Sequence, residues 1–416
     1  MTAFTRDFHN TFDYLDPEFG SRFYDVLDDL RTNCPVAHEA RRGWWFVSRY
    51  QDVRRVLLDW ETFSSAGPLG AAGRSVGPRH IPLAVDPPEQ RRWRQLLNPY
   101  FNPQRMAQLK GAVRDIADNL IDAFIESGEC DFVQDFTLHF PGLVFFTQIL
   151  GLPSEDVATC QHWIEQGVKG HQDTATAAAG FAALGNYVTR LVTARRESLK
   201  QQDDVIGAVV TAQIDGRAAT VEEQASVVTT LILGGLETTS NLVGSTVHFL
   251  ATHPALRIRL TADRDIRSTA VEEFLRYFAP TVWLGRTATA DTTIADQPIH
   301  QGDYVLVSYA SANRDETQFE RACEFVPDRD PNRHIAFGLG PHRCIGSHLA
   351  RLMFATALDR VLDRLTDLRL KDGEQASFHT SHIRGTERLP LAFTPGPRVK
   401  HAPTSTSTPN DQAAHA

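Results

Sequence analysis

One cysteine stands in a glycine-rich stretch near the C-terminal end of the chain and could present a thiolate to a bound group. The stretch Phe337–Gly346 reads FGLGPHRCIG, and a helical pattern of apolar residues follows Cys344. Glycines permit positive φ angles and close approach of the backbone to a bulky ligand, while a helix N-terminus favours the thiolate over the thiol. The stretch predicts an anionic sulfur held against something cationic or flat. The alternative for Cys344 is a small buried hydrophobe.

A second segment that could do chemistry lies in a long predicted helix over 221–252. It reads Gly234-Gly235-Leu236-Glu237-Thr238-Thr239. Two adjacent glycines cost about 2 kcal/mol of helix propensity together. A threonine hydroxyl that bonds back to the preceding turn can bend the helix and open space for a water or a ligand. Simple close packing of helices is the alternative reading of this segment.

A third pattern is E-x-x-R, formed by Glu273 and Arg276 on a predicted helix. Alone, such an i, i+3 pair is usually surface decoration worth a few tenths of a kcal/mol. Its position in the chain, between the long helix and the cysteine stretch, is what favours a structural role for this pair over surface decoration.

Composition narrows the class of protein. The chain has 416 residues, 42% hydrophobic and 22% charged, and a formal net charge of −9. The acidic balance gives no support for nucleic-acid binding. Five scattered cysteines without a C-x-x-C pair argue against a disulfide framework or a zinc or iron–sulfur site. The N-terminus does not resemble a signal peptide and no apolar run is long enough for a membrane span, so we expect a cytoplasmic protein without membrane contact.

The elements expected to position these motifs are mostly helices. Apolar periodicity predicts helices up to about residue 278, then short strands over 281–307, and a β-rich end near 391–393. Asp86, before two prolines, is predicted to cap a helix. A long loop over 61–85 is predicted to be a lid. We expect one mainly α domain with a small β region over 1–395 and a disordered tail over 396–416.

The pattern F-G-x-G-x-H-x-C-x-G over 337–346 resembles, position for position, the haem-binding loop of the cytochrome P450 family. The segment 234–239 is similar to that family's oxygen-activating [A/G]-G-x-[D/E]-T, and Glu273 with Arg276 to its buried Glu–Arg pair. The resemblance covers about 12–395, and 81–91 looks most like the soluble bacterial camphor-hydroxylase branch. It implies the P450 fold, with a long central helix across a haem held by a cysteine loop.

The resemblance also implies roles for individual residues. Cys344 would be the thiolate ligand of the iron in haem b, which favours O–O cleavage. Thr238 would hold the oxygen species and a water, and Glu237 would relay protons. Glu273, Arg276 and Arg329 would support the loop. The expected haem-binding positions, where many members have histidine in place of the first, are Gln90, Arg94, Arg286, Phe337, His342, Cys344 and Gly346.

The implied activity is a monooxygenase that uses O₂ and electrons from a separate ferredoxin and its NAD(P)H-dependent reductase, since no reductase module follows Cys344. The substrate is expected to be a small to medium apolar, aromatic or terpenoid-like molecule, with Trp283 making the pocket flatter. Arg74, Arg79 and His80 leave open a carboxylate on the substrate, with solvated loop charges as the alternative. The expected pocket residues are Leu69, His80, Thr230, Leu233, Gly234, Val282, Trp283 and Ile383.

Two other functions are compatible with the same fold. A haem-thiolate gas or redox sensor would not need proton delivery, so Glu237 beside Thr238 argues against it. A peroxide-driven oxygenase is a nearer rival, but such enzymes tend to lose the acid–threonine pair that this chain retains.

Overall fold

The computed structural model describes residues 12–14, 16–39, 41–67, 79–169, 174–198 and 203–399. The α-helices within these ranges are α1 Pro17–Ser21, α2 Phe23–Asn33, α3 Tyr50–Leu58, α4 Glu89–Leu97, α5 Pro103–Gln108, α6 Lys110–Asp122, α7 Phe140–Val144, α8 Asp156–Lys169, α9 Thr174–Glu197, α10 Val205–Val210, α11 Val221–Thr252, α12 Pro254–Ala262, α13 Arg267–Phe278, α14 Tyr309–Ala312 and α15 Ser347–Arg364. Two π-helical segments, η2 Val133–Thr137 and η3 Phe145–Leu150, flank α7.

The strands gather mainly in one sheet with the order β1-β2-β10-β7-β3. Its β2 and β10 run parallel, with Phe46 opposite Leu306, and the other pairs are antiparallel. Smaller sheets join β11-β14-β4, β12-β13, β5-β6 and β8-β9. The strands are β1 Val36–Glu39, β2 Trp44–Val47, β3 Phe63–Ser64, β4 Glu129–Asp131, β5 Gln213–Ile214, β6 Arg217–Ala218, β7 Trp283–Ala288, β8 Thr292–Ile294, β9 Gln297–Ile299, β10 Tyr304–Ser308, β11 Arg369–Leu370, β12 Ser377–Thr380, β13 Arg384–Arg388 and β14 Pro390–Ala392.

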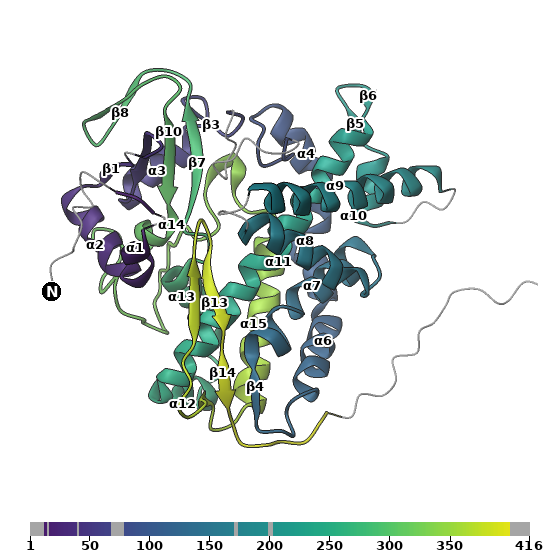
Figure 1. Cartoon of the computed structure of the whole chain (residues 1–416), viewed down its shortest axis with the longest axis vertical. Helices are drawn as coiled ribbons and strands as arrows, with labels where there is room; N and C mark the ends of the chain where they lie inside the picture. The colour runs from purple at the N-terminus through teal and green to yellow at the C-terminus, as the bar shows by residue number, and fades with distance from the viewer. Residues whose placement is uncertain are drawn as a thin grey trace, which may run out of the picture.

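The main sheet and α1–α3 form one side of the molecule, and the helices from α4 to α10 form the other (Figure 1). The long helix α11 crosses between them, with α15 beside it and the β12-β13 hairpin in front. The predicted mainly α fold with a small β region is confirmed. No helix in the described ranges combines the length and apolar character needed to cross a bilayer.

The central helix α11 has a strong start signal and a largely buried body. Thr220 is its N-cap, and a capping box joins the Thr220 side chain to the Glu223 backbone and the Glu223 side chain to the Thr220 backbone. Most of its following turns are buried, and the helix ends just before Pro254. The predicted bounds 221–252 are confirmed. The helix runs without interruption through the middle of the molecule.

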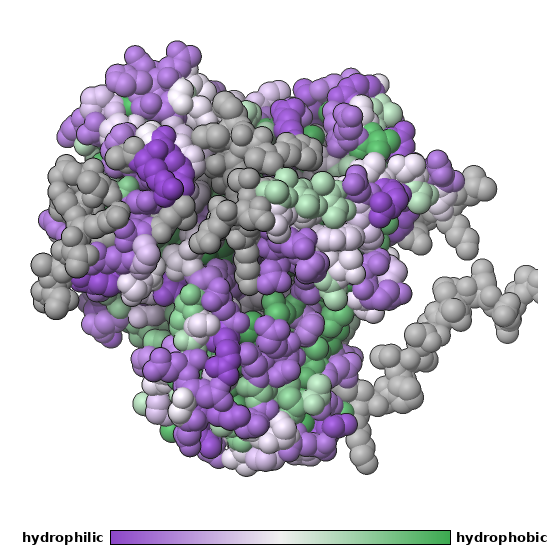
Figure 2. Space-filling model, in the orientation of Figure 1, coloured by the Kyte–Doolittle hydropathy of each residue, from purple (hydrophilic) through white to green (hydrophobic). Residues whose placement is uncertain are grey.

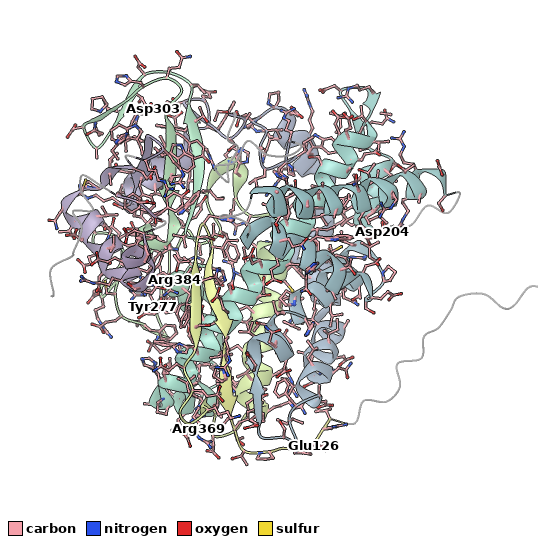
Figure 3. The ribbon with its side chains drawn as sticks, viewed as in Figure 1. Glu126, Asp204, Tyr277, Asp303, Arg369 and Arg384 are labelled. Carbon is pink, nitrogen blue, oxygen red and sulfur yellow. The ribbon has the colours of Figure 1, made fainter. Side chains whose placement is uncertain are left out.

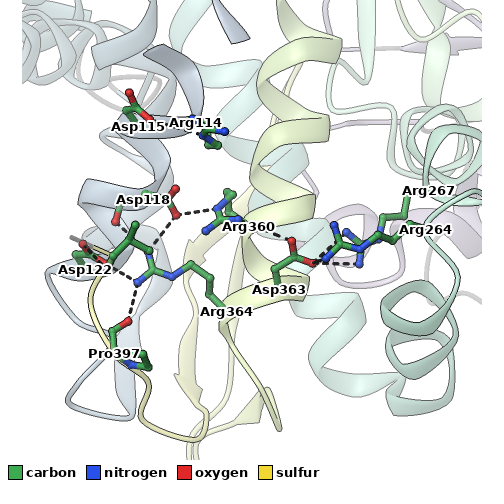
Figure 4. Close-up of polar contacts among 11 residues, drawn as sticks. Arg114, Asp115, Asp118, Asp122, Arg264, Arg267, Arg360, Asp363, Arg364 and Pro397 are labelled. Carbon is green, nitrogen blue, oxygen red and sulfur yellow. Dashed lines mark hydrogen bonds and ion pairs between the residues drawn. The ribbon is translucent and has the colours of Figure 1, made fainter. Parts of the chain in front are cut away.

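The helix after the cysteine loop, α15, is held on two sides by ion pairs (Figure 4). On one side Arg360 and Arg364 donate to Asp118 of α6, at 2.7 and 3.0 Å. On the other side Arg267 donates to Asp363 at 3.2 Å. Because Asp118 and Arg267 are nearly fully buried, these pairs fix the helix that follows Cys344 more firmly than exposed pairs would.

The chain past the predicted boundary at 395 remains bonded to the body. The Gly396 N–H donates to the Ile125 carbonyl at 3.1 Å, Arg364 donates to the Pro397 carbonyl at 3.1 Å, and the Val399 N–H donates to Asp122 at 3.1 Å. The prediction of disorder was therefore wrong for 396–399, where backbone groups rather than apolar side chains make the contacts. The rest of the predicted tail lies outside the described residues.

The face seen in Figure 2 is mostly hydrophilic, and hydrophobic residues gather in its lower middle. The core lies beneath. The largest apolar cluster joins α4 to α13 and α15, and two smaller ones lie on the sheet side.

Candidate functional site

The loop that carries Cys344 is a closed turn that requires glycine. Gly338 and Gly340 both have φ of +68°, a region open to glycine but costly for other residues. A Cβ on Gly340 would lie 2.7 Å from the Leu57 carbonyl oxygen. The Cys344 N–H donates to the Phe337 carbonyl at 2.8 Å, closing the loop. The sulfur is thus held three residues before Ser347, where α15 begins.

The thiol of Cys344 has accessible surface but lies deep within the protein. Burial raises its pKa, and the Gly346 N–H with the nearby charges of Arg94, Arg343 and Arg351 only partly offsets this. The prediction that the helix N-terminus favours the thiolate was therefore incomplete, because the loss of solvation outweighs these groups. A cation bound at the sulfur has to supply the rest of the stabilisation.

Two arginines near the loop have no acidic partner. Arg94 on α4 donates to the Arg343 carbonyl at 2.7 Å, and Arg286 on β7 donates to the Gly285 carbonyl at 2.7 Å and also contacts the Tyr309 hydroxyl. Arg286 is only 2% exposed, and neither arginine pairs with an aspartate or glutamate among the residues described. Buried guanidinium groups normally have an anionic partner, so this arrangement suits a ligand that carries carboxylates.

His342 adds a third polar group on the same side. Its imidazole is buried, and Nε2 has no hydrogen bond within the described part of the chain. Burial lowers the pKa of His342, with Arg286 and Arg94 acting in the same direction and Asp86 opposing them. The ring is therefore neutral near pH 7 and available to donate or accept one hydrogen bond. The predicted haem-binding residues Arg94, Arg286 and His342 thus surround Cys344 from three different elements.

Asp86 and Gln90 are used differently from their predictions. The helix α4 begins at Glu89 without a side-chain cap, so the prediction that Asp86 caps it was wrong. Instead the Asp86 carboxylate accepts from the Ser64 hydroxyl and from the Ser65 N–H at 2.9 Å, and lies 3.8 Å from His342 Nε2. Gln90 is buried and donates to the Pro341 carbonyl in the cysteine loop. Here its amide braces the loop, beside His342.

The central helix α11 has an open spot at Gly234. Gly234 is exposed although most of α11 around it is buried, and a Cβ there would meet nothing within 4 Å. Its neighbour Gly235 packs against the Phe145 ring, 3.0 Å from where a Cβ would stand. The Thr238 hydroxyl donates back to the Gly234 carbonyl at 3.4 Å, and Glu237 precedes it, half-buried. The helix remains continuous through this segment.

The predicted pocket residues fall into two groups. Thr230, Leu233 and Gly234 lie at i, i+3, i+4 on one face of α11, and the segment before α4 reaches this helix where the Ile81 N–H donates to the Ser226 hydroxyl at 2.9 Å. That bond places His80, whose pKa is lowered by burial, near the turn before Thr230. Leu69 lies outside the described residues.

The second group is Val282 with Ile383. Both are buried, the Val282 N–H donates to the His382 carbonyl at 2.8 Å, and Thr281 pairs with Ile383. Trp283 turns away: its ring packs on Tyr14 at 5.1 Å and on His382 at 5.9 Å, within the N-terminal aromatic cluster. Side chains alternate along a strand, so within β7 Trp283 points opposite to Arg286, although Val282 belongs to the same apolar cluster as Trp283. The prediction that it flattens the pocket was wrong.

The Glu273–Arg276 pair lies beneath the loop and is fully buried. Glu273 accepts two hydrogen bonds from Arg276, and also accepts from the Val326 N–H, Arg329 and Asn332 at 2.8 to 3.1 Å. Arg276 in turn donates to three backbone carbonyls, those of Asn313, Ala322 and Glu324. The predicted supporting residues, Arg329 included, are therefore brought together.

A neighbouring clamp was missed by sequence reasoning. Glu272 accepts two hydrogen bonds from Arg351 at 2.7 and 2.8 Å and one from His334 at 2.9 Å. The Arg351 guanidinium lies over the Phe337 ring, 4.5 Å from its centroid. Partial burial raises the pKa of Glu272, but the bonds from Arg351 and His334 outweigh it and lower the pKa to about 2. The clamp thereby ties α13 and α15 to the cysteine loop.

Comparison with known proteins agrees with this geometry. The family model for cytochrome P450 matches residues 170–383. Steroid C26-monooxygenase of Mycolicibacterium smegmatis is 32% identical over 377 residues, which cover 89% of this chain and 92% of that protein. The structure of a P450 EryK mutant with erythromycin B has a TM-score of 0.83 and 31% identity, covering 92% and 98% of the two chains. The structure of a Bacillus megaterium P450 in complex with testosterone has a TM-score of 0.82 and 26% identity, and the match covers 89% of this chain and 97% of that one.

The chain belongs to the cytochrome P450 family, and it is a monooxygenase of that family. The family uses haem b with a cysteine thiolate as axial ligand. The residues here fit such a group. The thiol needs a cation, and the guanidinium groups of buried Arg286 and half-buried Arg94, with no acidic partner in the described ranges, suit the two haem carboxylates together with the unbonded Nε2 of His342.

Proposed function

We propose that this chain is a haem-thiolate monooxygenase that inserts one oxygen atom of O₂ into an apolar substrate, with electrons from a ferredoxin and its reductase. Cys344 binds the iron, and Arg94, Arg286 and His342 bind the haem carboxylates. The observation that carries this assignment is that buried Arg286 and half-buried Arg94, on the same side as the Cys344 thiol, have no acidic partner among the described residues. Bound haem supplies the activation of O₂, which thiolate ligation promotes.

The loop residues keep the sulfur fixed while the cofactor reacts. The Gly346 N–H donates to the Cys344 sulfur and the Cys344 N–H is engaged by the Phe337 carbonyl, so the thiol cannot swing away. The Glu272–Arg351 clamp holds the Phe337 ring. Hydrogen bonds to a ligating sulfur and burial around it tune how strongly it donates.

We further propose that Thr238 and Glu237 deliver protons on the α11 side. The Thr238 hydroxyl, bonded to the Gly234 carbonyl at 3.4 Å, lies next to the exposed backbone of Gly234 and can hold a water there. Glu237, one residue earlier, can take a proton from solvent and pass it toward that water. Carboxylates in such positions act as general acids and bases.

The proposed substrate is apolar, of terpenoid or steroid size. Named relatives support this: one is a steroid monooxygenase, and one solved structure carries testosterone. A substrate carboxylate finds little support, since Arg79 is paired with Glu89 at 2.9 Å and burial lowers the pKa of His80, which leaves that imidazole neutral. Because Trp283 faces the N-terminal cluster, the reason for expecting a flat pocket no longer applies.

The proposed ferredoxin surface is the cysteine side. Arg91 and Arg343 are exposed there, and the Arg343 carbonyl is bonded to Arg94. Arg92 is paired with Asp215 and adds little net charge. Local positive charge on an acidic protein suits a docking acidic partner and should make association weaken with salt.

The absorption spectrum of the purified protein tests the cofactor assignment. Reduced with dithionite under carbon monoxide, it should show a strongly red-shifted Soret band, and Cys344→Ser should lose that band or move it to shorter wavelength. Testosterone and its carboxylated analogues, added to the oxidised protein, should differ in spin-state shift, with the neutral compounds binding more tightly. A protein that takes up no haem would overturn the assignment.

A further inference from the structure

A stripe of residues on α11 continues from Glu237 beneath the β12-β13 hairpin. Glu237, Asn241, Gly244 and His248 follow one another at i, i+4, i+7 and i+11, which places them on one face of the helix. The hairpin crosses in front of this helix, and Arg384 marks the start of β13 (Figures 1 and 3). The hairpin therefore covers the helix face on which the proposed proton-carrying carboxylate lies.

The contact between helix and hairpin is close and polar. The His379 Nε2 lies 3.2 Å from Asn241 Oδ1. A Cβ on Gly385 would overlap the Asn241 amide, and a Cβ on Gly244 would overlap the Thr386 hydroxyl. Only glycine at these two positions lets the backbones approach so far. We call the contact formed by Asn241, Gly244, His379, Gly385 and Thr386 the polar seam.

Two side chains in the polar seam have unused hydrogen-bonding atoms. Asn241 is 5% exposed, and its Nδ2 has no partner among the described residues; Thr386 Oγ1 has none there either. Leaving a buried polar atom unbonded costs about 1 to 3 kcal/mol. Native proteins commonly satisfy such atoms with ordered water. The polar seam thus has the donors and acceptors to hold water next to Glu237.

The polar seam also has an outer end. His379 is partly exposed on β12, whereas Asn241 is buried. Histidine is the side chain whose ordinary pKa lets it gain and lose protons near neutral pH. The other titratable or charged side chains on the helix and the two strands of the hairpin are His248 on α11, Glu222 and Glu223 in the first turn of α11, and Arg384, Glu387 and Arg388 on β13.

We propose that the polar seam carries protons from solvent to Glu237, with His379 as the group that takes them up and Asn241 as a positioning residue that orients the intervening water. This inference rests on the proposed role of Glu237. His379 gains a proton from solvent and releases one to water bound by Asn241, which passes one to the Glu237 carboxylate. No electron moves, and each group returns to its starting protonation state after Glu237 gives up its proton.

The first test measures the electrostatic coupling between His379 and Glu237 without any catalytic turnover. Histidine rings labelled with ¹³C in the haem-loaded protein are titrated by NMR, and the His379 signal is assigned by its loss in His379→Gln. Removing a partly screened negative charge in the neighbourhood of a histidine changes the pKa of that histidine by about 0.3 to 1 unit. Glu237→Gln should therefore lower the pKa of His379 by that amount. Asn241→Leu removes the side-chain amide that contacts His379 Nε2 but leaves both charges in place, so the pKa of His379 should still respond to Glu237→Gln while its line shape changes.

The second test reads proton delivery. NADPH oxidation is followed with a surrogate plant-type ferredoxin and its reductase, in H₂O and D₂O. Glu237→Gln should slow it by about tenfold or more, the scale of lost general-acid catalysis. Asn241→Leu and His379→Gln should each slow it several-fold and enlarge the solvent isotope effect. His300→Gln, an exposed histidine on another hairpin, should behave as wild type.

The outcomes separate the two levels of the proposal. If Glu237→Gln is slow while Asn241→Leu and His379→Gln match His300→Gln in rate and isotope effect, the polar seam is overturned and the role of Glu237 stands. If Glu237→Gln itself is unchanged, the role of Glu237 fails and the seam fails with it. Each variant is first checked for the wild-type carbon monoxide band. If Asn241→Leu lacks that band, the rate and isotope effect of His379→Gln, a substitution at the partly exposed end of the polar seam, decide whether the polar seam carries protons.

Discussion

The two sides of the proposed haem site are built in opposite ways. On the cysteine side, Glu273 is completely buried and accepts hydrogen bonds from four different residues, and Glu272 accepts from two more. On the α11 side, Gly234 is exposed inside a largely buried helix, and Asn241 Nδ2 has no partner within the described ranges. On the cysteine side the two buried or half-buried carboxylates are fully engaged by hydrogen bonds, whereas the α11 side keeps polar atoms and space available.

The difference follows from what each side has to do. A metal ligand must stay within a few tenths of an ångström of one position, and overlapping buried bonds hold it there. A side that admits substrate, oxygen and protons needs groups that can change partners. Substitutions on the two sides should therefore differ in kind, and the following predictions run from the largest expected effect to the smallest.

Removing the most buried carboxylate should collapse the cysteine side. Glu273→Ala leaves Arg276 buried without its anion, which costs about 3 to 5 kcal/mol. We expect a large drop in the urea midpoint and little of the red-shifted carbon monoxide band. Asp328→Ala is the matched control, because its pair with Arg259 at 2.9 Å is exposed on both sides and is worth about 1 kcal/mol or less. Equal losses in both variants would contradict the comparison.

The contribution of the Glu272 clamp to the free energy of unfolding should depend on pH. The pKa of Glu272, about 2 in the folded protein, lies below the value of about 4.3 for a free glutamate, so its stabilisation is present above pH 4.3 and is lost as pH falls toward 2. With allowance for its partial exposure, Glu272→Gln should lower the free energy of unfolding by about 1 to 2 kcal/mol at pH 7.

That difference between Glu272→Gln and wild type should narrow steadily in denaturation curves taken from pH 5 down to pH 2.5. A difference that stays constant over this range would mean that the carboxylate charge is not what the clamp uses.

On the α11 side, alanine substitutions at the two adjacent glycines should change stability in opposite directions, by smaller amounts. Gly234→Ala adds a methyl group into open space and should raise stability by up to about 1 kcal/mol through helix propensity. Gly235→Ala brings a methyl group within 3.0 Å of the Phe145 ring, and overpacking of about 1 to 3 kcal/mol should outweigh that gain. Thermal midpoints should move in opposite directions; a shift of the same sign and size would refute the packing difference.

Local sequence signals predicted much of the fold and of the cysteine side. A capping box marks the start of α11 and His253-Pro254 marks its end. The glycines of the cysteine loop indicate positive φ angles, and Gly338 and Gly340 adopt them. The Glu273–Arg276 pair was visible because its members are one helical turn apart. The Glu272–Arg351 clamp was not visible, since its members are 79 residues apart and no spacing rule connects them.

Other errors arose where tertiary contacts chose between local options. Asp86 has the residue type and the place of a helix cap, yet Ser64 and Ser65 of β3 and the adjoining turn engage its carboxylate. Trp283 could face either side of β7, and packing against Tyr14 decided the matter. The polar seam likewise depends on a hairpin more than 130 residues from Asn241 along the chain, a distance over which the sequence alone predicts no contact.

The bonds made by 396–399 bear on how the protein can be handled. Ile125 and Asp122 of the α6 region and Arg364 of α15 all accept or donate bonds to this short segment. Trimming the chain back to 395 would strip these partners from the two helices that the ion pairs of Figure 4 join. A purification tag or fusion partner attached beyond Val399 leaves them intact, so residue 399, and not 395, is the cut site that preserves the body of the enzyme.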